Sequence, residues 1–411
     1  MRRHKWYSPE EIPDKKLYPT EAINSVQEKL NLSRNNIKTK LFIDAIIYER
    51  PIIQMSHVLG SFKTASIFLE MPELLSDRIF TISTTHKSFS AYRGFLLNKK
   101  YETKKKELSR LGVSYNKNEH MELELFTDLK EISPSQRMEH AGTVLNLVRD
   151  KSAELVYFDP TKSVPLFKEI LLNSNAIVNR SVRTRRETYA LDSLTRIIEK
   201  GSYFEPFWTQ YMIKKMVDIS NLEEKTLKSC EELVETSYFL TGGAILGASI
   251  GIDTRFYPAI FRRCEKTIDK DYLREKVLRR ILDFYGIDPN AISSLSADSL
   301  KTIRKDPITR RLRNKIETTL KKSGFFAEDA ILKELCETID TESRIEKASQ
   351  YLTRCTMYAL DLAPAFLPGV TIAGDLLLEL ISRKQPTIPM TLFCTKLLPK
   401  EIAKSRLKNF L

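Results

Sequence analysis

The sequence is poor in glycine and proline, which supply 13 and 17 of its 411 residues. Long flexible linkers are therefore not expected, and no internal repeat or low-complexity segment interrupts the chain. Hydrophobic residues at 42% and charged residues at 29% are typical of a folded globular protein rather than a disordered one. Two or three domains are expected at this length, because a single hydrophobic core rarely grows so large.

Cysteine is also scarce, and its spacing fits no metal or disulfide framework. No two of the five cysteines form a C-x-x-C pair, and their number is odd. This pattern argues against a zinc site, a disulfide framework or a disulfide-linked partner. We expect buried, reduced thiols in a cytoplasmic protein. The five are Cys230, Cys264, Cys336, Cys355 and Cys394.

Targeting and membrane-spanning segments are missing as well. The N-terminus, MRRHKWYSPEEIPDKK, is basic but lacks the apolar core of a secretory signal peptide. No segment reaches the roughly 20 apolar residues of a clean transmembrane helix. The expected location is therefore cytoplasmic, with peripheral contact at the inner membrane surface left open.

No catalytic motif stands out, so whether the protein is an enzyme stays uncertain, leaning towards no. The sequence contains no G-x-x-x-x-G-K-S/T, G-x-G-x-x-G, H-E-x-x-H or G-x-S-x-G motif, and no cofactor or resident metal is expected. Asp and His at strand ends can bind a divalent metal or act as acid and base. The weak candidates are Asp44, His57, His86 and Asp159, and they leave a metal-dependent hydrolase or nuclease as one alternative.

The hydrophobic pattern predicts a mainly α protein with a smaller mixed domain at its N-terminus. Residues 1–160 are expected to form that α/β domain, with strands over 40–48, 78–83 and 154–158 and a helix over 57–70. Residues 161–411 are expected to form an all-helical bundle. Its predicted helices cover 272–285, 306–320, 328–339 and 343–362, with Asp306-Pro307 as a start signal and Gly286 as a stop signal.

A glycine-rich run is the most distinctive segment. Residues 236–252, TSYFLTGGAILGASIGI, carry no charge, and Gly243, Gly247 and Gly251 recur at a spacing of four. On a helix this spacing makes a smooth groove that another backbone can approach. We expect a close-packing helix inside the C-terminal bundle. Self-association, conditional membrane contact and ligand contact remain alternatives.

Positive charge is the other feature that points to a function. The chain has 66 Lys and Arg against 53 Asp and Glu, a net charge of +13, and nine of those basic residues lie between Lys301 and Lys322. On the 306–320 helix, the apolar residues form one stripe that leaves Arg310, Arg311, Arg313 and Lys315 mostly off it, where they are either a solvated face or contacts for phosphates. The residues expected to bind nucleic acid or another anion are Arg304, Lys305, Arg310, Arg311, Arg313 and Lys315.

Together these features predict an intracellular, non-enzymatic helical interaction protein. Its basic surface would recruit an anionic partner, and its glycine-rich helix would serve packing, self-association or conditional membrane contact. The expected partner is a protein or a second copy of the chain, with nucleic acid and an acidic membrane surface as alternatives. A nucleic-acid-binding subunit of a larger complex is the first alternative function.

Overall fold

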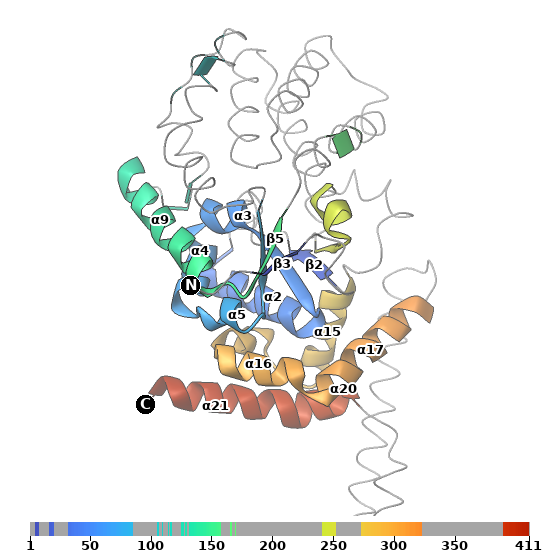
Figure 1. Ribbon diagram of the computed structural model, residues 1–411. Coiled ribbons are helices and arrows are strands. Elements are labelled where there is room, and N and C mark those ends of the chain that lie inside the picture. The colour runs from blue at the N-terminus through green and yellow to red at the C-terminus, as the bar shows by residue number, and fades with distance from the viewer. Residues whose placement is uncertain are drawn as a thin grey trace, which may run out of the picture. The chain divides into compact units, whose positions relative to one another are not determined.

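The computed structural model (Figure 1) describes residues 5–7, 16–19, 32–84, 131–157, 241–251, 273–322 and 389–410, with isolated positions over 105–129 and 165–169. The chain forms two compact units, Met1–Tyr272 and Leu273–Leu411. Most of the described residues are helical, which confirms the prediction of a mainly α protein. The boundary expected at residue 160 falls where few residues are described and stays a prediction. The helices expected over 328–339 and 343–362 lie outside the described residues.

Parallel strands form the sheet of the first unit. They pair in the order β1-β5-β4-β3-β2-β6, and each pairing is parallel. The strands predicted over 78–83 and 154–158 correspond to β4 and β5, and nearly all of β3, β4 and β5 is buried. The bounds are Lys5–Tyr7 (β1), Lys16–Pro19 (β2), Arg50–Gln54 (β3), Thr81–Thr84 (β4), Glu154–Tyr157 (β5) and Ser249–Gly251 (β6).

A layer of helices covers one face of this sheet. The strands β2, β3, β4 and β5 are successive in the chain and adjacent in the sheet, so each crossover steps in the same direction. Right-handed crossovers then place the intervening helices on one face, and α4 packs against both α2 and α9 (Figure 1). The helices are Arg34–Ile47 (α2), Met55–Gly60 (α3), Phe62–Glu70 (α4), Glu73–Ser76 (α5) and Pro134–Lys151 (α9). The helix predicted over 57–70 is confirmed as α3 and α4.

The first predicted strand is wrong, because residues 40–47 belong to helix α2 and Tyr48 is its C-cap. The side chain of Ser33 caps this helix by accepting a hydrogen bond from the backbone N–H of Asn36 at 3.2 Å. Residues 41–47 are all buried, and a helix that is buried on every side loses the polar stripe that identifies it. The β-branched residues in this run favoured a strand, and burial in the core overrides that propensity.

The glycine-rich run does not form the single helix that its spacing predicted. Residues 241–246 are helical, but strand β6 follows at Ser249–Gly251 and pairs with β2. Between them Gly247 has a φ of 53°, in the left-handed region that glycine adopts most readily. Gly251 therefore lies in a strand, and the three glycines do not line one helical groove.

Backbone hydrogen bonds explain why the helix ends at this glycine. The N–H of Ala248 donates to the carbonyl of Gly243 at 2.8 Å, and the N–H of Gly247 donates to the carbonyl of Ala244 at 3.1 Å. This is the Schellman pattern, in which a left-handed glycine satisfies the last free carbonyls of a helix. The spacing of four was interpreted as a packing surface, whereas Gly247 is a helix stop.

All the regular elements described in the second unit are helical. Both helices predicted here, over 272–285 and 306–320, are confirmed as α15 and α17. Helix α16 packs against α17 and α21 (Figure 1). The elements are α15 (Leu273–Phe284), the 3₁₀ turn η3 (Pro289–Ser294), α16 (Ala297–Lys305), α17 (Pro307–Lys322), α20 (Pro389–Leu392), the π-helical turn η4 (Phe393–Leu397) and α21 (Leu398–Phe410).

Helix α15 ends as predicted at Gly286, and this end gives a stability test. Gly286 has a φ of 66°, and the N–H of Ile287 donates to the carbonyl of Leu282 at 2.9 Å. An added Cβ would meet nothing within 4 Å, so Gly286→Ala tests backbone conformation alone. We expect it to lower the free energy of unfolding by about 1 kcal/mol.

Gly142 provides the matched control for this change. It lies inside helix α9, where an added Cβ also meets nothing within 4 Å. Alanine is the better helix former, so Gly142→Ala should raise the free energy of unfolding by about 0.5–1 kcal/mol. Urea denaturation followed by circular dichroism measures both variants. Stabilisation by Gly286→Ala would show that the helix stop does not require glycine.

Candidate anion-binding surface

Of the four residues considered for catalysis, the structure describes two. Asp44 is buried in helix α2 rather than lying in a strand, and His57 is buried in α3. His86 and Asp159 lie outside the described residues, two positions beyond the last residues of β4 and β5. Within the described ranges, no group of three His, Cys, Asp or Glu side chains could hold a metal ion.

Buried polar residues do gather where strands β3 and β4 end. Gln54 and Ser83 are register partners on the two strands, and α3, which carries His57, begins directly after β3. Carboxyl ends of parallel strands are where open α/β sheets bind ligands. However, burial lowers the pKa of His57 from 6.5 to about 3. With this pKa, the His57 imidazole is neutral at pH 7. An efficient acid–base residue has a pKa near the working pH, so the structure does not favour His57 in that role.

Positive charge is concentrated in the second unit. Its described residues, 273–322 and 389–410, contain 18 Lys and Arg against seven Asp and Glu. The resulting +11 compares with +13 for all 411 residues. A surplus this large within a small helical unit creates a local positive potential that attracts anions.

A shared cap at Asp306 positions the basic residues of α16 and α17. Asp306 ends α16, and its carboxylate accepts a hydrogen bond at 2.7 Å from the N–H of Ile308 in the first turn of α17. Pro307 suits the first helical position because its missing N–H would have no partner there. Helix α16 is therefore followed by α17 with Asp306 as the single residue between them, and Lys305 at the end of α16 is only five residues from Arg310 in α17.

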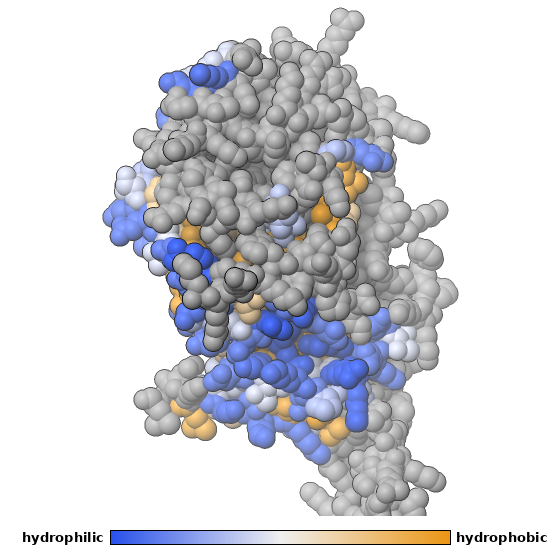
Figure 2. Space-filling view, viewed as in Figure 1, coloured by the Kyte–Doolittle hydropathy of each residue, from blue (hydrophilic) through white to orange (hydrophobic). Residues whose placement is uncertain are grey.

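Five of the six predicted anion-binding residues reach the solvent. Lys305, Arg310 and Arg311 are exposed, and Arg304 and Lys315 are partly exposed. Figure 2 shows hydrophilic side chains gathered over the face of the second unit that carries α16, α17 and α21.

Arg313 is the exception, because its side chain is only 9% exposed. It lies four residues after Thr309 and three before Ile316, and both of those side chains are buried. These spacings place the three on one face of α17. The prediction that Arg313 lies off the buried stripe is wrong, and it does not belong to the surface.

The sequence interpretation missed basic residues on the last helix. Lys396, Lys400 and Arg406, on η4 and α21, are exposed and were not among the expected anion-binding residues. The spacing of four between Lys396, Lys400 and Lys404 indicates one basic helical face and could have identified them. Their alternation with buried Leu397, Leu398 and Ile402 would have supported the same interpretation.

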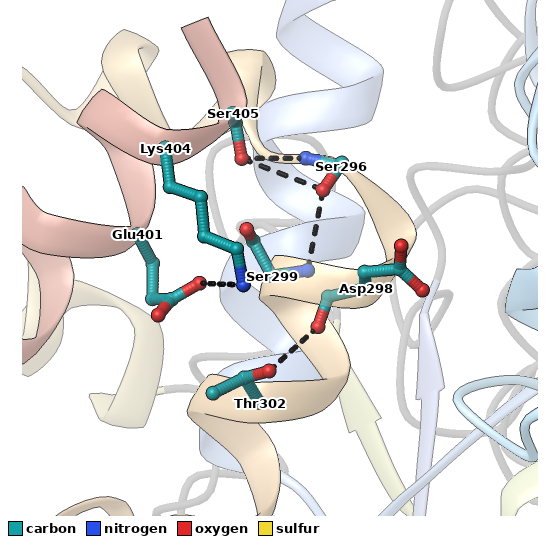
Figure 3. Close-up of polar contacts among 7 residues, drawn as sticks. All are labelled: Ser296, Asp298, Ser299, Thr302, Glu401, Lys404 and Ser405. Carbon is teal, nitrogen blue, oxygen red and sulfur yellow. Dashed lines mark hydrogen bonds and ion pairs between the residues drawn. The ribbon is translucent and has the colours of Figure 1, made fainter. Parts of the chain in front are cut away.

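Polar contacts fix α21 against α16 (Figure 3). The side chain of Ser405 accepts a hydrogen bond from the N–H of Ser296 at 3.0 Å, and Ser296 in turn caps α16 by accepting from the N–H of Ser299 at 3.2 Å. Within α21 itself, Lys404 Nζ lies 3.8 Å from the carboxylate of buried Glu401. The lysine-bearing helix and the arginine-bearing helices are therefore held in one packed unit.

Seven basic side chains form what we call the basic surface. Each is at least partly exposed, and none makes an ion pair with a residue in the described part of the chain. Unpaired cations at a surface keep their full attraction for an external anion. The seven are Lys305, Arg310, Arg311, Lys315, Lys396, Lys400 and Arg406.

The described residues expose few large apolar side chains. In the described ranges, only Phe284 and Leu407 are large hydrophobic side chains with high exposure, at 47% and 66%. None of the helices described here has the length and apolar content needed to cross a bilayer. Lone exposed hydrophobic residues are common on soluble domains, so these two do not make an apolar docking patch.

Comparison with known proteins gives this surface no relative. No family model matches the chain, and no curated protein or solved structure matches it either. What the surface does has to be inferred from its own residues.

Proposed function

We propose that the protein is an interaction module whose second unit recruits an anionic partner through the basic surface. The observation that supports this is the set of seven accessible cations without ion-pair partners among the described residues. Charged helix faces that serve solubility alone usually mix the two signs. In 389–410, five basic residues accompany a single acid, Glu401, which is buried.

The glycine-rich run has no part in this proposal. Its helix stops at Gly247, and the following strand joins the sheet of the first unit. Recruitment therefore depends on the helices of the second unit, whose packing fixes the backbone positions of the cations before any partner arrives. A preorganised backbone favours binding because little backbone freedom is lost on association.

Heparin, a generic polyanion, tests the proposal directly. We expect the triple variant Lys305→Gln/Arg310→Gln/Arg311→Gln to bind heparin on the order of 100-fold more weakly at 0.1 M salt, because three cations no longer release counterions. Titration calorimetry across a salt series measures this loss.

A matched variant in the first unit controls for the change in net charge. Lys105, Lys106 and Lys151 are exposed there, and replacing all three with Gln removes the same number of charges. This control should bind heparin almost as the unmodified chain does. Equal weakening in both variants would show that only net charge matters and would contradict a localised surface.

A further inference from the structure

We infer that the anionic partner is a nucleic acid, held by its phosphate backbone on α16, α17 and α21 without reading the base sequence. This inference rests on the proposed function, since it uses the same seven cations. It adds the chemical class of the partner and the manner of recognition.

The type and number of cations match a polyphosphate. The exposed pair Arg310 and Arg311 lies in the first turns of α17, and guanidinium groups present a planar fork that fits phosphate oxygens. The lysines of η4 and α21 add point charges on a second helix. A nucleic acid carries one charge per phosphate along its whole length, so it can engage several separated cations at once.

A lipid bilayer fits the same surface less well. A helix that lies in a membrane interface must turn an apolar face towards the acyl chains. In η4 and α21 the apolar residues Phe393, Leu397, Leu398 and Ile402 are buried inside the unit, and Leu407 is the one highly exposed apolar side chain among those that the structure describes there. The described side chains of this surface therefore offer charge without the apolar area that membrane insertion requires.

The polar groups beside the cations are already occupied by local contacts. The hydroxyls of Thr302 and Thr318 donate to backbone carbonyls of their own helices, at 2.9 Å and 2.7 Å. The Asp306 carboxylate occupies the N-terminus of α17, where a phosphate could otherwise bind. The groups left to meet a ligand on this surface are Lys and Arg heads, and the contacts that such heads make with phosphates carry no sequence information.

Fluorescence anisotropy with labelled DNA tests this inference. The full chain is titrated with two 20-base-pair duplexes of unrelated sequence and with a 20-nucleotide single strand, between 50 and 200 mM salt. We expect the two duplexes to bind within about threefold of each other, with affinity that falls steeply as salt rises.

The variant Arg310→Gln/Arg311→Gln locates the contacts. Loss of two phosphate contacts should reduce the slope of log affinity against log salt by about 1.8 and weaken duplex binding about 60-fold at 0.1 M salt. The variant Lys105→Gln/Lys106→Gln, in the first unit, removes the same charge and should leave the slope unchanged. Circular dichroism confirms that each variant is folded.

Each other outcome overturns a specific claim. An unchanged slope in the arginine variant removes α17 from the interface, and a preference above tenfold between the duplexes contradicts backbone-only recognition. Binding to heparin or to vesicles containing phosphatidylserine, without binding to DNA, rejects nucleic acid but leaves the proposed function standing. Failure to bind heparin rejects the proposed function itself.

Discussion

Replacing Glu154 with Gln should lower the free energy of unfolding by about 3 kcal/mol. The Glu154 side chain, at the start of β5, is only 5% exposed. Its carboxylate pairs with Arg50 at the start of β3 and with Arg78, whose Nε lies 3.5 Å away, before β4. A pair with a buried member is expensive to break because water cannot fully replace the lost contact at the buried side. Both arginines keep some solvent contact, so we expect the lower end of the range for buried pairs.

An exposed pair in the same unit provides the comparison. Arg149 and Asp150 form an ion pair in α9, and both side chains are well exposed. Asp150→Asn should therefore cost less than about 0.5 kcal/mol. The double variant Glu154→Gln/Arg50→Gln should be less destabilised than the sum of its single variants. Equal costs for Glu154→Gln and Asp150→Asn in chemical denaturation would show that burial adds nothing to this pair.

Helix ends were the part of the fold that the sequence predicted best. Asp306-Pro307 starts α17, and Gly286 ends α15, because a capping side chain, a fixed φ and a positive φ are local requirements. The same local chemistry operates at Gly247. It was missed there because two further glycines at a spacing of four suggested a continuous packing surface.

The predictions failed where burial, rather than local capping chemistry, decides the structure. Helix α2 lies so deep in the core that its pattern lost the period of 3.6 residues, and its β-branched side chains indicated a strand. Arg313 illustrates the reverse error, since a charged residue was assigned to the surface although its spacing from Thr309 and Ile316 places it on the buried face. Which face of a helix is buried depends on neighbouring helices, which one segment of sequence does not specify.

The sequence predicted the part of the candidate surface on α16 and α17 but not the part on η4 and α21. Five of the six expected residues on α16 and α17 reach solvent, since exposure of lysine and arginine is the rule, and four of these five belong to the basic surface. The contribution of η4 and α21 required tertiary structure, because η4 begins 71 residues after the end of α17 in the sequence, and η4 and α21 pack against α17 and α16 through the fold. Periodic lysines alone indicate an exposed face and do not identify the helices beside it.

Lowering the pH from 7 to 5 should reduce the free energy of unfolding by about 2 kcal/mol through His57 alone. Burial lowers the pKa of this imidazole in the folded chain to about 3, against 6.5 for an ordinary histidine. Below pH 6.5 the unfolded chain therefore binds a proton that the folded chain does not, so stability falls as the pH falls from 6.5 towards 3. Above pH 6.5 both states carry a neutral imidazole, and this contribution is constant.

The variant His57→Gln isolates this effect, because glutamine is polar but does not titrate. Its free energy of unfolding should decrease between pH 7 and pH 5 by about 2 kcal/mol less than that of the unmodified chain. The comparison uses the difference between two pH values, so a packing defect that is equal at both cancels. His140→Gln, which removes an exposed imidazole from α9, measures the effect of the same substitution at the surface. If His57→Gln retains the full decrease, the acid sensitivity arises elsewhere and His57 is not held neutral by burial.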